Sequence, residues 1–243
     1  MSKLNRFYIL AHPDDEIMSL PLLCEKRYKH LILFLTVDEN SPRYREASKA
    51  ISLLRSQGSD IELIVNPKPS VDGLAHLNWT KSVFLELVEL INSLLPDEIV
   101  STHYEGGHQD HDTAFILGFI ASKILNVRFI SFSTYRKSKL IFPKFRTMHT
   151  IANHLNIRFN RLAIVHRAFL LILIYRSQWK TWVGLGPFVI LRYLGGKTNF
   201  IADVKNLDNI QIHNTFYEYR NRAKTSAVIE KHDELLSFFS YRR

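Results

Sequence analysis

The stretch FYILAHPDDE, residues 7–16, joins an apolar run to a dense group of ionisable side chains. The run Phe7–Leu10 is short, aromatic and branched, which is typical of a buried β-strand. It is followed directly by one imidazole and three carboxylates, those of His12, Asp14, Asp15 and Glu16. Because the binding crevice of an open α/β sheet lies at the carboxyl ends of its strands, this stretch predicts a sheet and a site at its edge.

Outward from this stretch, apolar runs alternate with amphipathic segments. Strands are predicted at residues 7–10, 30–37, 61–65, 97–102 and 127–133, and helices at 16–27, 42–58, 81–95 and 113–125. The run at 30–37 is almost continuously apolar, as strands buried on both faces are. The alternation predicts an α/β fold with a mostly parallel sheet and helices on both faces.

The pattern changes after Tyr135, where basic residues alternate with apolar blocks. This part is predicted to be mainly helical, with a break at Gly195-Gly196, a strand at 200–204 and a closing helix at 217–239. We therefore expect a core over residues 1–135. Residues 136–243 are expected to form a basic, apolar-rich helical elaboration and the closing elements of the same domain.

The amino-acid composition excludes an internal disulfide and argues against a membrane-spanning helix. The chain has 243 residues, and its single cysteine, Cys24, excludes an internal disulfide. The longest apolar block in the second half, residues 168–175, is too short for a membrane-spanning helix. The N-terminus leads into the first strand without a long apolar signal region, so we expect a cytoplasmic protein.

Charge is distributed unevenly along the chain. Residues 1–112 contain 11 Lys/Arg and 17 Asp/Glu, whereas residues 113–202 contain 14 Lys/Arg and no acidic residue. One interpretation is a solvated basic face. The other is a surface that contacts phosphates, anionic lipid or nucleic acid.

A second group of ionisable side chains, HYEGGHQDHD at residues 103–112, follows the predicted strand 97–102. If the strands are parallel, both groups lie at the same edge of the sheet. Alone, each group is also explained by helix capping, but two such groups at neighbouring strand ends favour a site. Imidazole and carboxylate bind Zn2+, which keeps a position for water in catalytic sites. The most economical ligand set is His12, Asp15 and His111, with Asp14 facing the water.

These residues also carry a resemblance to a known family. The strand followed by AHPDDE, and HQDH within EGGHQDHD, resemble the two signature motifs of the N-acetylglucosaminyl-phosphatidylinositol de-N-acetylase (PIG-L/LmbE-like) family, over roughly residues 7–135. Its members are zinc-dependent hydrolases that remove acetyl groups from N-acetylated amino sugars. The resemblance implies a Rossmann-like (LmbE-like) fold. It also implies metal ligands His12, Asp15 and His111, with Asp14 as general base and His108 stabilising the oxyanion.

Further residues are candidates for supporting roles. The sequence RYRE, with Arg43 and Glu46, resembles the family's Arg-x-x-Glu pattern, and either a salt bridge or a substrate contact fits it. HQDH replaces the usual HPDH, and Gly107 stands where some relatives have a Tyr, so Tyr104 is considered in its place. Asp110 is expected to orient an imidazole. Capping of a helix start is an equal alternative for the remaining acidic candidates, Glu16, Glu105 and Asp112.

The residues suit amide hydrolysis. Zinc can lower the pKa of a water to about 7 and polarise an acyl oxygen, and Fe2+ or Co2+ fits the same ligands. Asp14 would take the proton of the water and pass it to the leaving amine. A protonated His108 would face the oxyanion.

The expected substrate is an N-acetylated amino sugar, either without or with a phosphate- or lipid-linked group. The basic segment 113–202 suits a substrate with such a group, and it equally suits an anionic membrane surface, with the protein peripheral at the inner face of the membrane. A catalytically silent glycan-binding module is one alternative. A nucleic-acid-binding protein is another, suggested by the basic charge and by Trp179 and Trp182, but acidic clusters without a metal would repel phosphate. The sequence does not indicate an oligomeric state.

Overall fold

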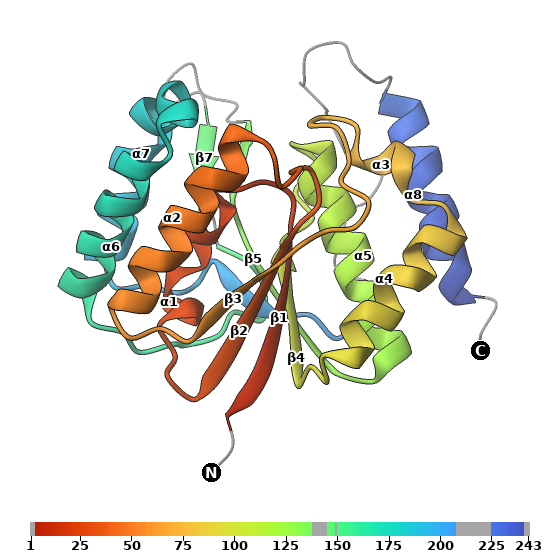
Figure 1. Ribbon diagram of the computed structural model, residues 1–243, viewed down its shortest axis with the longest axis horizontal. Helices are drawn as coiled ribbons and strands as arrows, with labels where there is room; N and C mark the ends of the chain where they lie inside the picture. Colours follow the sequence, from red (N-terminus) through yellow and green to blue (C-terminus); the bar gives the residue numbers. More distant parts are fainter. Residues whose placement is uncertain (1–2, 138–144, 149, 208–224, 241–243) are drawn as a thin grey trace.

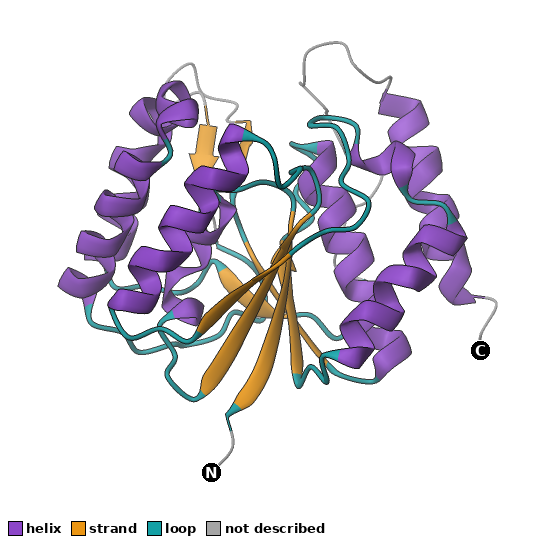
Figure 2. Ribbon diagram, viewed as in Figure 1, coloured by secondary structure: helices purple, strands orange, loops and turns teal. Residues whose placement is uncertain are grey.

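The computed structural model describes residues 3–137, 145–148, 150–207 and 225–240. A six-stranded sheet in the order β3-β2-β1-β4-β5-β8 runs through its centre (Figure 2). The strands of this sheet are β1 (Leu4–Leu10), β2 (Tyr28–Phe34), β3 (Ile61–Ile64), β4 (Glu98–Thr102), β5 (Arg128–Phe132) and β8 (Ile201–Asp203). The first five are parallel and β8 is antiparallel to β5. A separate two-stranded sheet pairs β6 (Tyr135–Lys137) with β7 (Phe145–Thr147).

Helices cover both faces of the sheet. One face carries α1 (Leu20–Leu23), α2 (Pro42–Ser56), α6 (Arg161–Ile174) and α7 (Trp179–Leu194), on the left in Figure 1. The other carries α3 (Ala75–Asn78), α4 (Lys81–Ser93), α5 (Gln109–Leu125) and α8 (Thr225–Ser240), on the right. Two short 3-10 helices, η1 (Asp15–Ser19) and η2 (Arg176–Gln178), complete the described elements.

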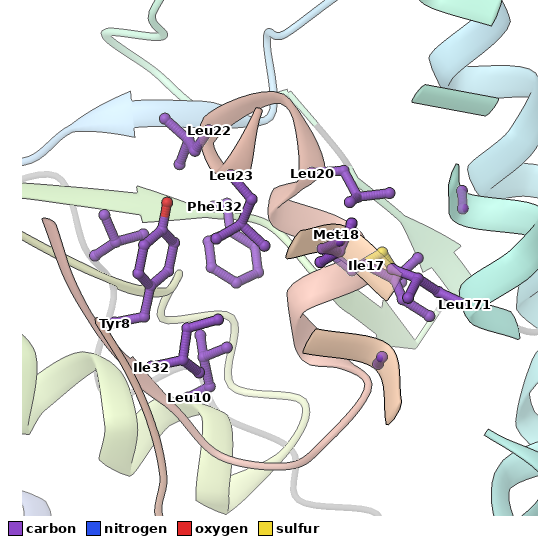
Figure 3. Close-up of a cluster of buried hydrophobic side chains, with 14 of the residues drawn as sticks. Tyr8, Leu10, Ile17, Met18, Leu20, Leu22, Leu23, Ile32, Phe132 and Leu171 are labelled. Carbon is purple, nitrogen blue, oxygen red and sulfur yellow. The ribbon is translucent and has the colours of Figure 1, made fainter. Parts of the chain in front are cut away.

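Alternation of side chains along β1 divides the interior into two cores. Tyr8 and Leu10 enter one core, which also takes in η1, α1 and Leu171 of α6 (Figure 3). Phe7 and Ile9 enter the other core, beneath α4 and α5. Both faces of this strand are therefore apolar, as a parallel sheet covered on both sides requires.

The position of β1 in the sheet determines where a site can form. Leu10 pairs with Phe34 of β2, and Ile9 pairs with Ser101 of β4. The chain that leaves β1 therefore emerges beside the chain that leaves β4. From β1, the strands β2 and β3 are added on one side of the sheet and β4 and β5 on the other. A crevice opens at the carboxyl ends of the two strands between which the order changes direction, here β1 and β4.

The mostly parallel α/β fold with helices on both faces is confirmed, with corrections to single elements. The helix predicted at 16–27 is a 3-10 helix followed by one α-helical turn. The chain has to turn after Cys24, because Tyr28 already pairs with Leu4 at the start of β2. The β6–β7 sheet was not predicted. Of the closing helix predicted at 217–239, residues 217–224 lie outside the described residues, and α8 covers the rest.

Candidate metal centre and active site

A tight turn after β1 brings two of the predicted ligands together. Asp14 adopts a left-handed backbone conformation with φ 103°, which reverses the chain. Asp15 begins η1, and its Oδ2 accepts the backbone N–H of His12 at 2.9 Å. The HPDDE sequence therefore folds back on itself, so that the Asp15 carboxylate lies beside the His12 imidazole.

The third predicted ligand reaches the same point from α5. His111 Nε2 lies 3.3 Å from His12 Nδ1 and 3.1 Å from Asp15 Oδ1, and His12 Nδ1 lies 3.9 Å from Asp15 Oδ2. Tetrahedral coordination at ~2.0 to 2.2 Å separates neighbouring donor atoms by roughly 3.3 to 3.6 Å. All three residues are buried. The spacing of these donor atoms fits a divalent metal ion, and the chemistry of the set suits one.

The two imidazoles use their other nitrogens to contact protein oxygens. His12 Nε2 lies 3.0 Å from Asp110 Oδ2 and 3.1 Å from Asp72 Oδ1. His111 Nδ1 lies 3.0 Å from Thr134 Oγ1. Contacts of this kind fix the ring orientation and tautomer of a metal ligand and raise its basicity.

Asp110 is itself held rigidly. It is fully buried in the first turn of α5, where its Oδ2 accepts the Gly73 N–H at 2.6 Å and its Oδ1 accepts the Ala75 N–H at 2.9 Å. The loop between β3 and α3 is thereby attached to the site. The same loop delivers Asp72 to His12.

A second set of donor atoms, from His12, Asp72, His108 and Asp110, is also close enough to hold an ion. The set of His12, Asp15 and His111 is the better ligand set, because the Asp110 carboxylate already accepts two backbone N–H groups.

The pKa values in this cluster show strong electrostatic coupling. Burial alone would raise the pKa of Asp15, but the neighbouring His111 and His12 outweigh it and lower the pKa to about 2. Burial alone would lower the pKa of His12, but hydrogen bonds to Asp110 and Asp72 raise it to about 10. Asp15 is therefore ionised, as a metal ligand has to be, and a metal bound at this site would displace the proton that the two carboxylates hold on His12.

Asp14 lies next to these ligands in a different environment. Burial raises its pKa well above the ordinary value, and the negative charge of Asp15 adds to the effect. Its backbone N–H donates to Glu16 Oε2 at 2.9 Å, and its Oδ2 accepts the Trp182 indole N–H at 3.1 Å. These contacts fix the Asp14 carboxylate on the wall of the pocket.

Glu16 is fully buried and supports the turn at Asp14 through the backbone contact described above. Its Oε1 accepts the Tyr175 hydroxyl, and burial raises its pKa to about 7.

His108 occupies the N-cap of α5. Its Nδ1 accepts the Asp110 backbone N–H at 3.2 Å, and its ring stacks on His111 with centroids 4.6 Å apart. Burial lowers its pKa, and the neighbouring His111 and His12 lower it further. The lowered pKa and the acceptor role of Nδ1 favour a neutral ring over the expected protonated one, with Nε2 as the nitrogen that can carry a proton and donate.

A pocket of about 490 Å³, counting its open mouth, lies over the cluster. Arg43 reaches it from α2 and donates to Asp72 Oδ2 at 3.1 Å. The Arg43 Nε atom is buried and makes no hydrogen bond. The elements η2 and α7 contribute further polar and apolar side chains to the wall, namely Gln178, Thr181, Trp182 and Leu185.

Of the predicted supporting residues, Arg43 lines the pocket and the others do not. Glu46 accepts the backbone N–H of Ser177 at 3.0 Å, and not the Arg43 guanidinium, so it anchors η2. The Tyr104 ring packs against Phe115 and His232 in the second core, so it does not replace the missing Tyr. Glu105 Oε1 accepts the Thr134 N–H at 2.7 Å and so positions the residue behind His111.

Several site residues had no clear signal in the sequence. Asp72 lies in an Asp-Gly turn that reads as an ordinary loop, and Thr134 follows β5 as one of many polar residues. Tyr175 and Trp182 belong to the basic helical segment, where aromatic residues were interpreted as apolar blocks. The position of Thr134 directly after a parallel strand is the one pattern that could have indicated it.

Solved structures share this fold, although no protein-family model and no curated protein matches the sequence. A deacetylase of the teicoplanin biosynthesis pathway, solved with teicoplanin, matches with a TM-score of 0.55 and 12% identity, over 83% of this chain and 100% of its own. The zinc-inhibited form of teicoplanin deacetylase Orf2 matches with a TM-score of 0.55 and 11% identity, over 83% and 99%.

Two further solved structures are similar. The A40926 pseudoaglycone deacetylase Dbv21 matches with a TM-score of 0.56 and 12% identity, over 82% of this chain and 95% of its own. A conserved protein from Thermus thermophilus matches with a TM-score of 0.53 and 20% identity, over 82% and 93%. The chain therefore has the fold of these deacetylases, the Rossmann-like fold expected from its two motifs.

Proposed function

We propose that the protein is a metal-dependent N-deacetylase that removes the acetyl group from an N-acetylated amino sugar. One observation carries this proposal: three donor atoms converge at metal-ligand spacing, namely His12 Nδ1, Asp15 Oδ1 and His111 Nε2. They lie beside the buried carboxylate of Asp14 in an open pocket. The shared fold with solved deacetylases supports the same reaction class.

A divalent ion held by these three ligands would lower the pKa of water and polarise the acetyl oxygen. Zn2+ is the proposed ion on ligand type, and Fe2+ or Co2+ suits the same set. Since a solved neighbour is a zinc-inhibited form, the identity of the ion needs direct measurement.

The residues of the chain supply the proton transfers. Asp14 accepts a proton from the attacking water and delivers it to the departing amine, and a raised pKa suits a carboxylate for both steps. The Trp182 N–H keeps one Asp14 oxygen fixed during the transfer. Neutral His108 donates from Nε2 to the oxygen on which negative charge develops.

The substrate is proposed to be an amino sugar bearing phosphate or lipid. Arg43 supplies a cation at the pocket wall, and its buried Nε is a donor that a phosphate or sugar oxygen could satisfy. Candidate substrates differ in the sugar and in the group attached to it, so the test has to cover several substrates.

Mass spectrometry of a panel of N-acetylated sugars tests the proposal, with free, nucleotide-linked and lipid-linked sugars incubated with the metal-loaded protein. We expect loss of one acetyl group from at least one lipid- or phosphate-linked member. Binding of a sugar without loss of acetyl by any member would instead identify a glycan-binding module and overturn the proposed reaction.

A further inference from the structure

The hairpin of α6, η2 and α7, residues 161–194, exposes an unusual amount of apolar surface. Of the twelve large hydrophobic residues that are exposed in the described part of the chain, seven belong to this hairpin. We call these seven the outer face: Leu162, Phe169, Leu173, Trp179, Val183, Leu191 and Leu194. Exposed apolar side chains that gather on one surface are typical of an interaction site.

The seven side chains lie on one side of the hairpin. In α6, Leu162, Phe169 and Leu173 are spaced by seven and four residues, which places them on one helical stripe. The opposite stripes of α6 and α7 are buried in one common core, through residues such as Leu171 and Val189. Both exposed stripes therefore face away from that core, and Figure 1 shows the two helices at the left edge of the molecule.

The charged side chains of the hairpin itself are all basic, and Glu46 of α2 contacts it at Ser177. No acidic residue occurs between positions 113 and 202. Exposed Arg158, Arg161 and Lys197 line a hollow at the end of the hairpin where α6 begins and α7 ends. At the other end, Arg176 and Lys180 are exposed, and the Lys180 Nζ lies 5.8 Å from the Trp179 ring centroid.

We propose that the outer face docks on an anionic membrane surface. An apolar stripe flanked by arginine and lysine, with an exposed tryptophan at one end, suits insertion at the headgroup level. None of the helices in the described residues is long and apolar enough to cross a bilayer. The proposal is therefore one of docking at the surface and not of insertion across the membrane. A second copy of the chain is the less favourable occupant, because a symmetric contact would bring the basic ends of two hairpins together.

Docking in this way brings the pocket to the membrane. Gln178 and Thr181 line the pocket, and Trp179 and Lys180 between them are exposed. The mouth of the pocket thus borders the outer face. The docking proposal stands independently of the proposed reaction, since it is tested by binding alone.

Flotation with vesicles tests the proposal, using phosphatidylcholine alone or mixed with phosphatidylglycerol. We expect binding to the mixed vesicles, with little to phosphatidylcholine alone and release by high salt. The double variant Phe169→Ser/Leu173→Ser should bind at least about tenfold more weakly. The control Leu77→Ser/Leu95→Ser, which replaces exposed apolar side chains elsewhere, should bind like the wild type.

A second pair of variants tests the charges. Arg176→Glu/Lys180→Glu should weaken binding by roughly 25-fold or more, at about fivefold for each cation lost. The matched control Lys26→Glu/Lys205→Glu changes exposed lysines outside the hairpin and should weaken binding much less.

Equal binding to both kinds of vesicle, or unchanged binding by Phe169→Ser/Leu173→Ser, would overturn the proposal. Sedimentation velocity without lipid gives a further test. A wild type that is dimeric, with Phe169→Ser/Leu173→Ser monomeric, would also overturn the proposal, because the outer face would then bind a second copy. Phe169→Ser/Leu173→Ser and Arg176→Glu/Lys180→Glu should both still deacetylate a water-soluble substrate. Failure of docking is thereby distinguished from failure of the proposed reaction.

Discussion

The carboxylate of Asp14 is fixed before any substrate binds, by its own backbone contact to Glu16 and by the indole of Trp182. It is close to the ligand atoms without being one of the three that converge. Its proposed role, proton transfer, is therefore separable from metal binding.

We expect Asp14→Asn to retain the metal and to lower kcat by about 10²- to 10⁴-fold, the usual contribution of a general base. Acetate release and metal content, measured on the same preparation, check this. Asp38→Asn, an exposed carboxylate outside the pocket, is the control. An Asp14→Asn enzyme with full activity would remove the base from the mechanism.

Asp110 acts on the metal through His12. An asparagine there would replace one carboxylate oxygen by an NH₂ group, which cannot accept from Gly73 N–H or Ala75 N–H. We expect Asp110→Asn to lower metal affinity by about 10- to 100-fold, as loss of such a supporting contact does. Competition with a chromogenic chelator measures the affinity, with the exposed Asp233→Asn as control. Unchanged affinity would show that Asp110 has a purely structural role.

The residues that the sequence could identify are those at strand ends. His12 and Asp15 follow β1, His111 lies in the first turn of the helix that comes after β4, and the fold brings them together. Asp72 and Trp182 could not be predicted, because each reaches the site from a segment whose local pattern carries no chemical signal. Their positions depend on tertiary packing, which places a loop and a distant helix over the same sheet edge.

At the scale of elements, the close packing of α5 on the sheet depends on Gly118, which has no side chain. A Cβ on Gly118 would lie 2.9 Å from Phe129 Cε2 and 3.2 Å from Ser101 Cβ. We expect Gly118→Ala to lower the free energy of unfolding by about 1 to 3 kcal/mol, the usual cost of overpacking. Denaturant unfolding measures it. Gly184→Ala in α7 is the matched control, since its Cβ would meet no atom within 4 Å. Equal stability of the two variants would contradict the close packing of α5.

Strand β2 contains a buried histidine with a pH-dependent effect on stability. His30 Nδ1 lies 3.2 Å from the Tyr8 hydroxyl, and burial, reinforced by Arg6, lowers its pKa to about 3. A histidine in the unfolded chain has a pKa near 6.5. Between these values the unfolded state binds more protons than the folded state, so His30 lowers the stability of the fold as the pH falls through this window.

The variant His30→Gln removes this proton linkage. The free energy of unfolding of the wild type, minus that of His30→Gln, should therefore fall on acidification by at most about 1.4 kcal/mol per pH unit below pH ~6.5. Denaturant unfolding at several pH values measures the difference. A difference that stays constant with pH would show that His30 titrates normally in the folded protein.

Two element boundaries show why local patterns gave incomplete predictions. The sequence placed the start of a helix at Thr113, but α5 begins at Gln109, because His108 caps it and the HQDH side chains are used within its first turn. Likewise, the turn at Asp14 adopts a left-handed conformation that a single sequence does not reveal for a non-glycine residue. Both departures from local preference occur at the proposed site.

For the whole molecule, the predicted division into a core and an elaboration stays a prediction. The structure shows that the second part contributes β8 to the main sheet and Trp182 to the pocket wall. Segments from both parts therefore surround the site. The alternation of strands and helices over the first 135 residues was sufficient to predict the sheet, whereas the arrangement of α6 and α7 depended on apolar packing that periodicity does not specify.

Metal content is the measurement that tests the central claim most directly. Elemental analysis of the purified wild type should give about one divalent ion per chain, and His111→Ala should lose it. The control His166→Ala, an exposed imidazole on α6, should retain the ion. Equal metal content in wild type and His111→Ala would contradict the claim that His12, Asp15 and His111 form a metal centre.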